Sequence, residues 1–180
     1  SDVCSSDLGP GRLLDEVGID VARHAGETLH GAFGERLAPA PILERMLAAD
    51  RLGRKNGRGF YRYEDGEEKG VDSEVYADLG LPDPEPGSHP GEEIRRRLVL
   101  VMINEAARCL EEEVVADAGQ LDLAMILGTG FPPFRGGLMR YADTRGAGRV
   151  ATRLQALADS EGPRFEPAEL LTQYASSRGR

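Results

Sequence analysis

Residues 92–113 of this 180-residue chain read EEIRRRLVLVMINEAARCLEEE, and this stretch decides the fold class. It contains neither Pro nor Gly and is long enough for about six turns of α-helix. Its centre, 98–103, is the longest apolar run of the chain. That run is too short to cross a membrane and suits a helix packed in a protein core. The stretch therefore predicts one long core helix.

A helical projection at about 100° per residue predicts which side of this helix is buried. The apolar residues that share one stripe are Ile94, Leu98, Val101, Met102 and Cys109. Glu105 falls inside the stripe, where a carboxylate has to be paired, hydrogen-bonded or protonated. It either presents a polar group to a pocket or neighbouring active site, or accepts backbone N–H groups from another helix. Asn104 lies off the stripe, and Cys109 is interpreted as a core residue rather than a nucleophile.

The sequence after residue 113 predicts three more helices joined by short turns. Asp117 and Gln120 match a capping box at a helix start, and Gly128–Gly130 stops that helix. Residues 131–134, Phe-Pro-Pro-Phe, predict a rigid turn. The apolar residues expected to mark the next helix are Val150, Leu154 and Leu157. Pro167 is expected to begin the last helix.

Residues 9–80 predict shorter helices and one hairpin. Asp20 is expected to cap a helix after Gly18, and the run Pro39-Ala40-Pro41 to open another helix. Residues 53–63 are rich in Gly and end in aromatics, which favours a tight turn and a short strand. Residues 81–91 hold four of the eleven prolines and predict a linker to the second part, 92–180.

Positions 128 residues apart show a weak internal repeat. The identical pairs are Gly9 and Gly137, Asp15 and Asp143, Gly18 and Gly146, and Leu29 and Leu157. Four identities are also compatible with chance. Both segments nevertheless follow the order Gly, short helix, Asp, Gly, longer helix. A duplicated helical domain explains this order if the first copy lacks its opening helices.

Composition narrows the classes of partner. The net charge is −9, which disfavours a nucleic acid or an anionic membrane as the main partner. Two cysteines cannot form a disulfide framework, so a reducing cytosol is expected. Residues 1–8, SDVCSSDL, match the translation of a common sequencing adapter and are expected to be a non-native leader in which Cys4 has no function. A genuine polar tail is the alternative. With a non-native leader, the chain is expected to be a fragment.

No catalytic, cofactor-binding or metal-binding residue is expected from spacing. The three histidines have no metal-ligand grouping, and no Ser-His-Asp or Cys-His arrangement is evident. A basic cluster surrounds the Gly-rich turn and contains Arg51, Arg54, Lys55 and Arg58. It either holds a phosphate through guanidinium and backbone N–H groups or is a solvated basic turn. The residues alone support a pair of helical domains without a self-contained active site.

Four segments and Asp122 resemble parts of the C-terminal domains of 3-hydroxyacyl-CoA dehydrogenases. Residues 51–61, RLGRKNGRGFY, resemble the end of a first such domain, and residues 9–20 resemble the helix pair before it. Residues 102–106, Asp122 and residues 128–137, GTGFPPFRGG, resemble a second copy. Two copies occur in the α-subunit of the bacterial fatty-acid β-oxidation complex. The resemblance implies an all-α fold of two domains, 9–80 (truncated) and 92–180.

The resemblance also implies a reaction and its partners. The full protein would join an enoyl-CoA hydratase domain and an NAD-binding domain to these helical domains, and would oxidise (3S)-3-hydroxyacyl-CoA to 3-oxoacyl-CoA. Its catalytic His and Glu would lie upstream, so the fragment alone is expected to be inactive and to bind no NAD. A thiolase β-subunit and a location in the bacterial cytoplasm are implied as well.

The fragment is then expected to form one wall of the acyl-CoA cleft and to make interdomain or subunit contacts. The residues expected at the cleft or the interdomain face are Asn104, Glu105, Phe131 and Phe134. Relatives can have a Tyr near the substrate just before the Gly-x-Gly-Phe turn, where this chain has Leu127. A free-standing helical interaction or dimerisation module without catalysis is the alternative function.

Overall fold

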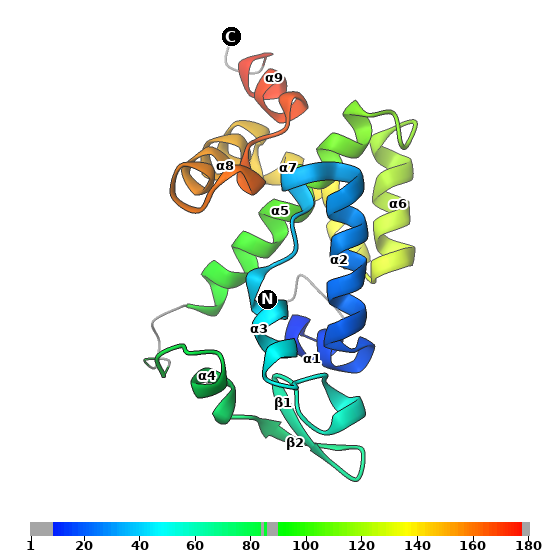
Figure 1. Cartoon of the computed structure of the whole chain (residues 1–180). Helices are drawn as coiled ribbons and strands as arrows, with labels where there is room; N and C mark the ends of the chain where they lie inside the picture. Colours follow the sequence, from blue (N-terminus) through cyan, green and yellow to red (C-terminus); the bar gives the residue numbers. More distant parts are fainter. Residues whose placement is uncertain (1–8, 84, 86–89, 178–180) are drawn as a thin grey trace. The chain divides into compact units, whose positions relative to one another are not determined.

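Helices dominate the computed structural model, which describes residues 9–83, 85 and 90–177 (Figure 1). The chain divides between residues 88 and 89 into two compact units, called the first and the second unit below. Within the described residues the only sheet is an antiparallel pair of strands. The predicted helical fold class is therefore confirmed. The leader expected at 1–8 and much of the expected linker lie outside the described residues.

The first unit combines three main helices with a hairpin. Its elements are α1 (Pro10–Val17), α2 (Ile19–Phe33), η1 (Gly34–Leu37), α3 (Pro41–Ala48), η2 (Arg54–Asn56), β1 (Tyr61–Glu64), β2 (Glu67–Val71) and α4 (Glu74–Asp78). The helix predicted to open at Pro39-Ala40-Pro41 is α3, and it begins at the last residue of that run, Pro41, because the fixed φ of proline suits a first helical position. The expectation that Asp20 caps α2 was wrong. Gly18, with φ of 101°, precedes the helix, and Asp20 lies in its first turn.

The second unit is built around one long helix. Its elements are α5 (Gly91–Glu111), α6 (Ala118–Thr129), η3 (Pro133–Arg135), α7 (Leu138–Arg145), α8 (Ala147–Glu161), η4 (Pro163–Phe165) and α9 (Glu169–Ser177). Helices α7, α8 and α9 all pack against α5, and α6 packs against α7. Asp117 caps α6 as predicted, since its carboxylate accepts from the Gln120 N–H at 2.9 Å.

Helix positions in the two units repeat at a constant spacing. Helices α7, α8 and α9 start 128 residues after α1, α2 and α3, at Leu138, Ala147 and Glu169 against Pro10, Ile19 and Pro41. The first two pairs also have equal lengths, 8 and 15 residues. A Gly with positive φ separates the helices of each pair, at Gly18 (101°) and Gly146 (85°). The local sequence repeat thus corresponds to a structural repeat of helix–Gly–helix corners.

The start of α7 is held by a carboxylate from α6. Asp122 accepts from the backbone N–H groups of Met139 at 2.6 Å and Arg140 at 3.1 Å. These two donors belong to the first helical turn and have no partner within the helix. A Cβ atom on Gly137 would lie 2.2 Å from the Cβ atom of Asp122, and its φ is 109°. Only glycine lets the two segments approach this closely.

The hairpin of the first unit is tied to α1 by the buried side chain of Asp15. Its carboxylate accepts from the N–H groups of Phe60 and Tyr61, both at 2.9 Å, and from the Tyr63 hydroxyl at 3.2 Å. A Cβ atom on Gly59 would lie 2.1 Å from this carboxylate. Burial raises the pKa of Asp15 despite these donors. The Asp15 carboxylate therefore fixes where the hairpin begins.

Replacing Asp15 with Asn should destabilise the first unit by about 1–3 kcal/mol. The amide has a single acceptor oxygen, so one of the two backbone N–H groups is left buried without an acceptor. Urea unfolding followed by circular dichroism measures the loss. Asp143→Asn is the matched control, because Asp143 lies 128 residues further on and is exposed. Equal losses in both variants would contradict a specific role for Asp15.

Candidate functional site

Asn104 is the buried polar residue of α5, with 3% of its surface exposed. Its Nδ2 atom donates to the Glu166 carbonyl at 2.7 Å, and its Oδ1 atom accepts from the Ala168 N–H at 2.8 Å. Arg108 donates to the same Glu166 carbonyl at 2.8 Å. One amide side chain thus satisfies a donor and an acceptor in the segment that leads into α9. This contact positions α9 on α5.

The predicted stripe on this helix was on the wrong side. Ile94 and Leu98 remain 48% and 45% exposed, whereas the opposite face is buried. The residues of α5 that are buried are Val99, Leu100, Ile103, Asn104, Ala106 and Ala107. The run 98–103 is apolar all around the helix, so apolar spacing alone does not select a face. Ala106 and Ala107 lie on the buried face, where their small side chains permit close packing of the neighbouring helices.

The four residues expected at a cleft or interdomain face do not form one cluster. Asn104 and Phe131 lie inside the second unit, where Phe131 is 3% exposed and packs edge-on against Tyr141 at 6.2 Å between ring centroids. Glu105 is half-buried. Phe134 is 74% exposed and lies under the Arg135 guanidinium. Their assignment to a substrate cleft or interdomain face stays a prediction, with Phe134 the most accessible of them.

The outer cations of the basic turn in the first unit are exposed to solvent and lie beside carboxylates. Each cation outside the core contacts a carboxylate: Arg54 binds Glu16, Lys55 binds Asp20, and Arg58 binds Glu74 and Asp78. The exposed side chains of Arg54, Lys55 and Arg58 agree with the interpretation of a solvated basic turn, whereas the buried Arg51 does not. Phosphate binding by this turn stays a prediction. The neighbouring acids offset the charge of these cations, and exposed ion pairs of this kind stabilise a fold only weakly.

Arg51 is the fully buried member of this cluster. Its Nη1 atom donates to Asp72 and to the Gly59 carbonyl, both at 2.8 Å, and its Nε atom donates to Asp78 at 2.8 Å. Burial on its own would raise the pKa of Asp72, but the hydrogen bond and charge of Arg51 lower it. Asp72 was not identified from the sequence, because its partner lies 21 residues away on another element.

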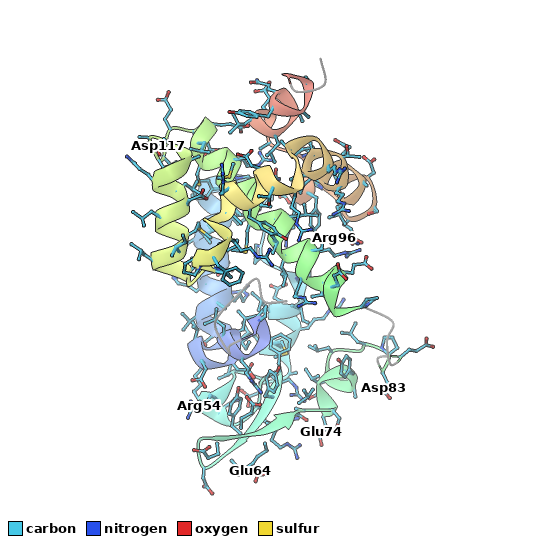
Figure 2. All side chains as sticks on the ribbon, turned by 180° about the vertical axis from the view of Figure 1, so that it is seen from behind. Arg54, Glu64, Glu74, Asp83, Arg96 and Asp117 are labelled. Carbon is cyan, nitrogen blue, oxygen red and sulfur yellow. The ribbon has the colours of Figure 1, made fainter. Side chains whose placement is uncertain are left out.

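A cavity of about 590 Å³ lies within the second unit. It is bordered by the N-terminal half of α5, the turn after α6, α7 and the start of α8. Six arginines line it: Arg95, Arg96, Arg135, Arg145, Arg149 and Arg153. Arg96 is labelled on α5 in Figure 2. Sequence reasoning missed this site, although the run Arg95–Arg97 and the four-residue spacing of Arg149 and Arg153 were visible.

The described residues show no arrangement typical of catalysis. They contain no group of three or more His, Cys, Asp or Glu side chains placed to hold a metal. None of the described helices is both long and apolar enough to span a bilayer. The buried carboxylates and amides bind backbone or arginine groups of the same unit. The geometry therefore defines a mostly helical protein of two units with structural polar contacts and one arginine-lined cavity.

Comparison with known sequences identifies the family. The profile described as 3-hydroxyacyl-CoA dehydrogenase, C-terminal domain, matches residues 3–63 and 94–179. The chain belongs to this family, and the resemblance inferred from its motifs is confirmed. The chain is also 46% identical over 171 residues to the fatty acid oxidation complex subunit alpha of Shewanella amazonensis (strain ATCC BAA-1098 / SB2B). The match covers 94% of this chain and 24% of that protein, so the chain spans about a quarter of its length.

Two solved structures share the fold. The 3-hydroxybutyryl-CoA dehydrogenase of Escherichia coli K12 aligns with a TM-score of 0.70 and 22% identity, covering 99% of this chain and 53% of that one. The dehydrogenase part of multifunctional enzyme 1 from C. elegans aligns with a TM-score of 0.65 and 29% identity, covering 92% of this chain and 38% of that one. The first likeness concerns the fold alone.

Replacing Asn104 with Ala should destabilise the second unit by about 2–4 kcal/mol, because the buried Ala168 N–H loses its acceptor. The Ala168 amide should also exchange its hydrogen faster. Both quantities are measurable by urea unfolding and hydrogen exchange. Gln155→Ala is the control, since the exposed Gln155 bonds only to Asp159 within α8. Unchanged exchange at Ala168 would contradict the role given to Asn104.

Replacing Asp72 with Asn should cost the first unit about 3 kcal/mol at neutral pH, because Arg51 then keeps a buried charge with one acidic partner fewer. The folded pKa of Asp72 lies below the ordinary value near ~3.9. Its stabilising contribution is therefore complete above that ordinary value and is lost as the pH falls through the folded pKa.

The stability difference between the natural chain and Asp72→Asn should accordingly shrink in acid, as measured by urea unfolding at a series of pH values. Asp78→Asn should have the smaller effect, since the Asp78 side chain is 33% exposed. A difference that stayed constant from neutral pH into acid would show that the charge of Asp72 is not what stabilises the unit.

Proposed function

We propose that this chain is part of a multifunctional bacterial fatty acid oxidation α-subunit that oxidises (3S)-3-hydroxyacyl-CoA to 3-oxoacyl-CoA with NAD. In this proposal the chain supplies one wall of the acyl-CoA cleft and interdomain contacts, while the catalytic His and Glu lie in an upstream domain. The observation that carries the proposal is the 46% identity across 94% of this chain to such a subunit.

NAD does not fit the residues that the structure describes. Dinucleotides bind at the carboxyl ends of parallel strands, next to a helix that follows a Gly-rich turn. Within the described residues the strands β1 and β2 form a lone antiparallel pair. We therefore assign NAD binding to another domain of the full protein and assign no step of hydride transfer to this chain.

The two units are proposed to be two copies of one helical domain, divided as 9–80 and 92–180 and joined by the linker 81–91. Support comes from the constant spacing of three helix pairs and from the two separate matches to one family profile. In the second unit Tyr141 is 8% exposed beneath α5, whereas its counterpart Leu13 is 51% exposed. The first copy is accordingly proposed to pack against helices of the full protein that correspond to α5 and α6.

The remaining partners follow from the same proposal. The full subunit would carry an enoyl-CoA hydratase domain, assemble with a thiolase β-subunit and act in the bacterial cytoplasm. Support is limited to the name of the Shewanella relative, which is a subunit of a complex. Glu105 and Phe134 are the proposed contacts of the second unit with neighbouring domains or substrate, because both retain solvent exposure.

The exposed apolar side chains of α1 and α2 also support a second candidate, a module that dimerises without catalysis. These side chains are Leu13, Val17, Val21, Leu29 and Phe33. A second copy of the chain could cover them as well as helices of a longer protein could. In light scattering, dimerisation would appear as a rise in molar mass from that of one chain to that of two as the protein concentration increases. The double variant Val17→Lys, Val21→Lys would abolish this rise.

A chimera tests the dehydrogenase proposal directly. Residues 9–180 of this chain replace the aligned segment of the Shewanella amazonensis α-subunit, and NADH formation from a 3-hydroxyacyl-CoA is measured. The chimera should recover activity that the subunit lacks when the segment is deleted. This chain alone should form no NADH, because its described residues contain no catalytic pair.

Two controls make the result decisive. The chimera with Asp143→Asn should keep its activity, since this exposed side chain is not expected to affect packing. A folded chimera no more active than the deleted subunit would overturn the proposal. NADH formation by the isolated chain would overturn it as well.

A further inference from the structure

The side chains that line the cavity of the second unit have a net positive charge, whereas the chain as a whole has a net negative charge. The lining contains six arginines and one acidic residue, Glu92, in a protein of net charge −9. Like charges gathered at one site repel one another and cost folding free energy. Fold stability therefore does not explain why six guanidinium groups are gathered in one cavity of a negatively charged chain, and another role has to be considered.

The cavity arginines have no acidic partner among the described residues, unlike seven of the other arginines that the structure describes. Seven of the twelve described arginines outside the lining form ion pairs with carboxylates, namely Arg12, Arg23, Arg51, Arg54, Arg58, Arg62 and Arg97. None of the six cavity arginines forms an ion pair with any described residue. Arg145 donates only to the Tyr141 hydroxyl at 3.0 Å. The Nε atom of Arg135 is buried and has no hydrogen-bond partner within the described part of the chain.

Arg97 of α5, next to two of the cavity arginines, has the acidic partners that they lack. Arg97 follows Arg95 and Arg96 directly but lies outside the cavity lining. It pairs with Glu93 on its own helix and with Glu161 of α8 at 2.9 Å. Carboxylates are thus available on this unit to balance an arginine. The cavity excludes them apart from Glu92, which leaves its guanidinium groups able to bind an external anion.

The structural repeat supplies an internal control for the fold. The positions of Arg145, Arg149 and Arg153 correspond, at the spacing of 128 residues, to Val17, Val21 and Ala25. The same helix–Gly–helix corner is therefore built without these charges in the first unit. The helix–Gly–helix corner itself does not require arginine at these positions. In the second unit Arg145 also packs over the Tyr141 ring, whereas no packing contact of this kind involves Arg149 or Arg153 among the described residues, so binding accounts better for these two.

The shape and chemistry of the cavity indicate the ligand. Its volume, about 590 Å³, lies in the range of small-molecule sites. Guanidinium groups bind phosphate oxygens in pairs, and several of them suit a ligand with several phosphates. Apolar side chains, namely Val99, Leu100, Ile103 and Val150, line the same space and suit an aromatic base. Inorganic ions alone would leave this apolar lining unused.

We propose that this cavity binds the phosphorylated adenosine of an organic phosphate, with the 3′-phosphate and diphosphate of coenzyme A as the source. The choice of coenzyme A rests on the proposed function, in which the substrate is an acyl-CoA. The cavity would hold the phosphate end of the substrate while its acyl end reacts at another domain. A free adenine nucleotide shares the chemistry and is distinguished by the experiment below.

Calorimetric titration of the 180-residue chain tests the site. Coenzyme A should bind, 3′-dephospho-CoA should bind more weakly, and pantetheine, which has no phosphate, should not bind. Affinity for coenzyme A should fall as salt rises, because the contacts are ionic. Tighter binding of coenzyme A than of ATP assigns the source to coenzyme A, and the reverse order assigns it to a free nucleotide and overturns that part of the proposal.

The triple variant Arg145→Val, Arg149→Val, Arg153→Ala gives the second unit the residues of the first. It should bind coenzyme A about tenfold more weakly or worse, since charged hydrogen bonds are removed. Its urea midpoint should stay close to that of the natural chain, because the relief of repulsion offsets the loss of the contact between Arg145 and Tyr141. Single variants form a matched pair: Arg149→Val should weaken binding, and Arg140→Val, on α7 but outside the lining, should not.

The outcomes separate this proposal from the proposed function. Unaltered coenzyme A binding by a folded triple variant, or no binding by the natural chain, overturns the cavity site even where the chimera is active. Displacement of coenzyme A by poly-glutamate at equal charge concentration overturns it in favour of an acidic protein partner. An inactive chimera overturns the dehydrogenase proposal, while phosphate-dependent binding by the isolated chain still supports the cavity as an adenosine-phosphate site.

Discussion

Buried polar side chains that bind the backbone of distant segments hold each unit together. In the first unit the Asp15 carboxylate accepts from Phe60 and Tyr61, and in the second the Asn104 amide binds Glu166 and Ala168. Helices of 8 to 21 residues would otherwise meet loops whose N–H groups lie buried without acceptors. Each contact joins segments 45 to 64 residues apart, so it fixes topology rather than local structure.

The repeat separates what the fold requires from what it tolerates. Both units keep the positive-φ glycine between a short and a longer helix, because no other residue adopts this corner easily. The side chains on the surface of the corner differ between the two units: they are valine and alanine in the first unit and arginine in the second. The conserved feature of the pair is thus its backbone, and chemical specialisation lies in the side chains that the corner exposes.

Local signals explain how far the sequence predicted the structure. Pro41, the Asp117 cap and the glycines at 128–130 defined helix ends, since capping depends on neighbours in the chain. The buried face of α5 was not predictable from its apolar run, which surrounds the helix. Asp15 and the arginine cavity escaped prediction for another reason. Their partners come from several elements, and distance in sequence conceals them until the chain is folded.

A helical unit without catalytic groups can still determine how fast a charged substrate arrives. Positive charge gathered in a cavity attracts polyanions over a Debye length of about 8–10 Å, even on a chain of negative net charge. Interactions with a remote phosphate are the same in the ground state and the transition state, so they lower KM and leave kcat unchanged. Capture and chemistry can then evolve on separate domains. If the cavity captures the substrate as proposed, one corner can have arginines where its counterpart has valine and alanine without any effect on a reacting group.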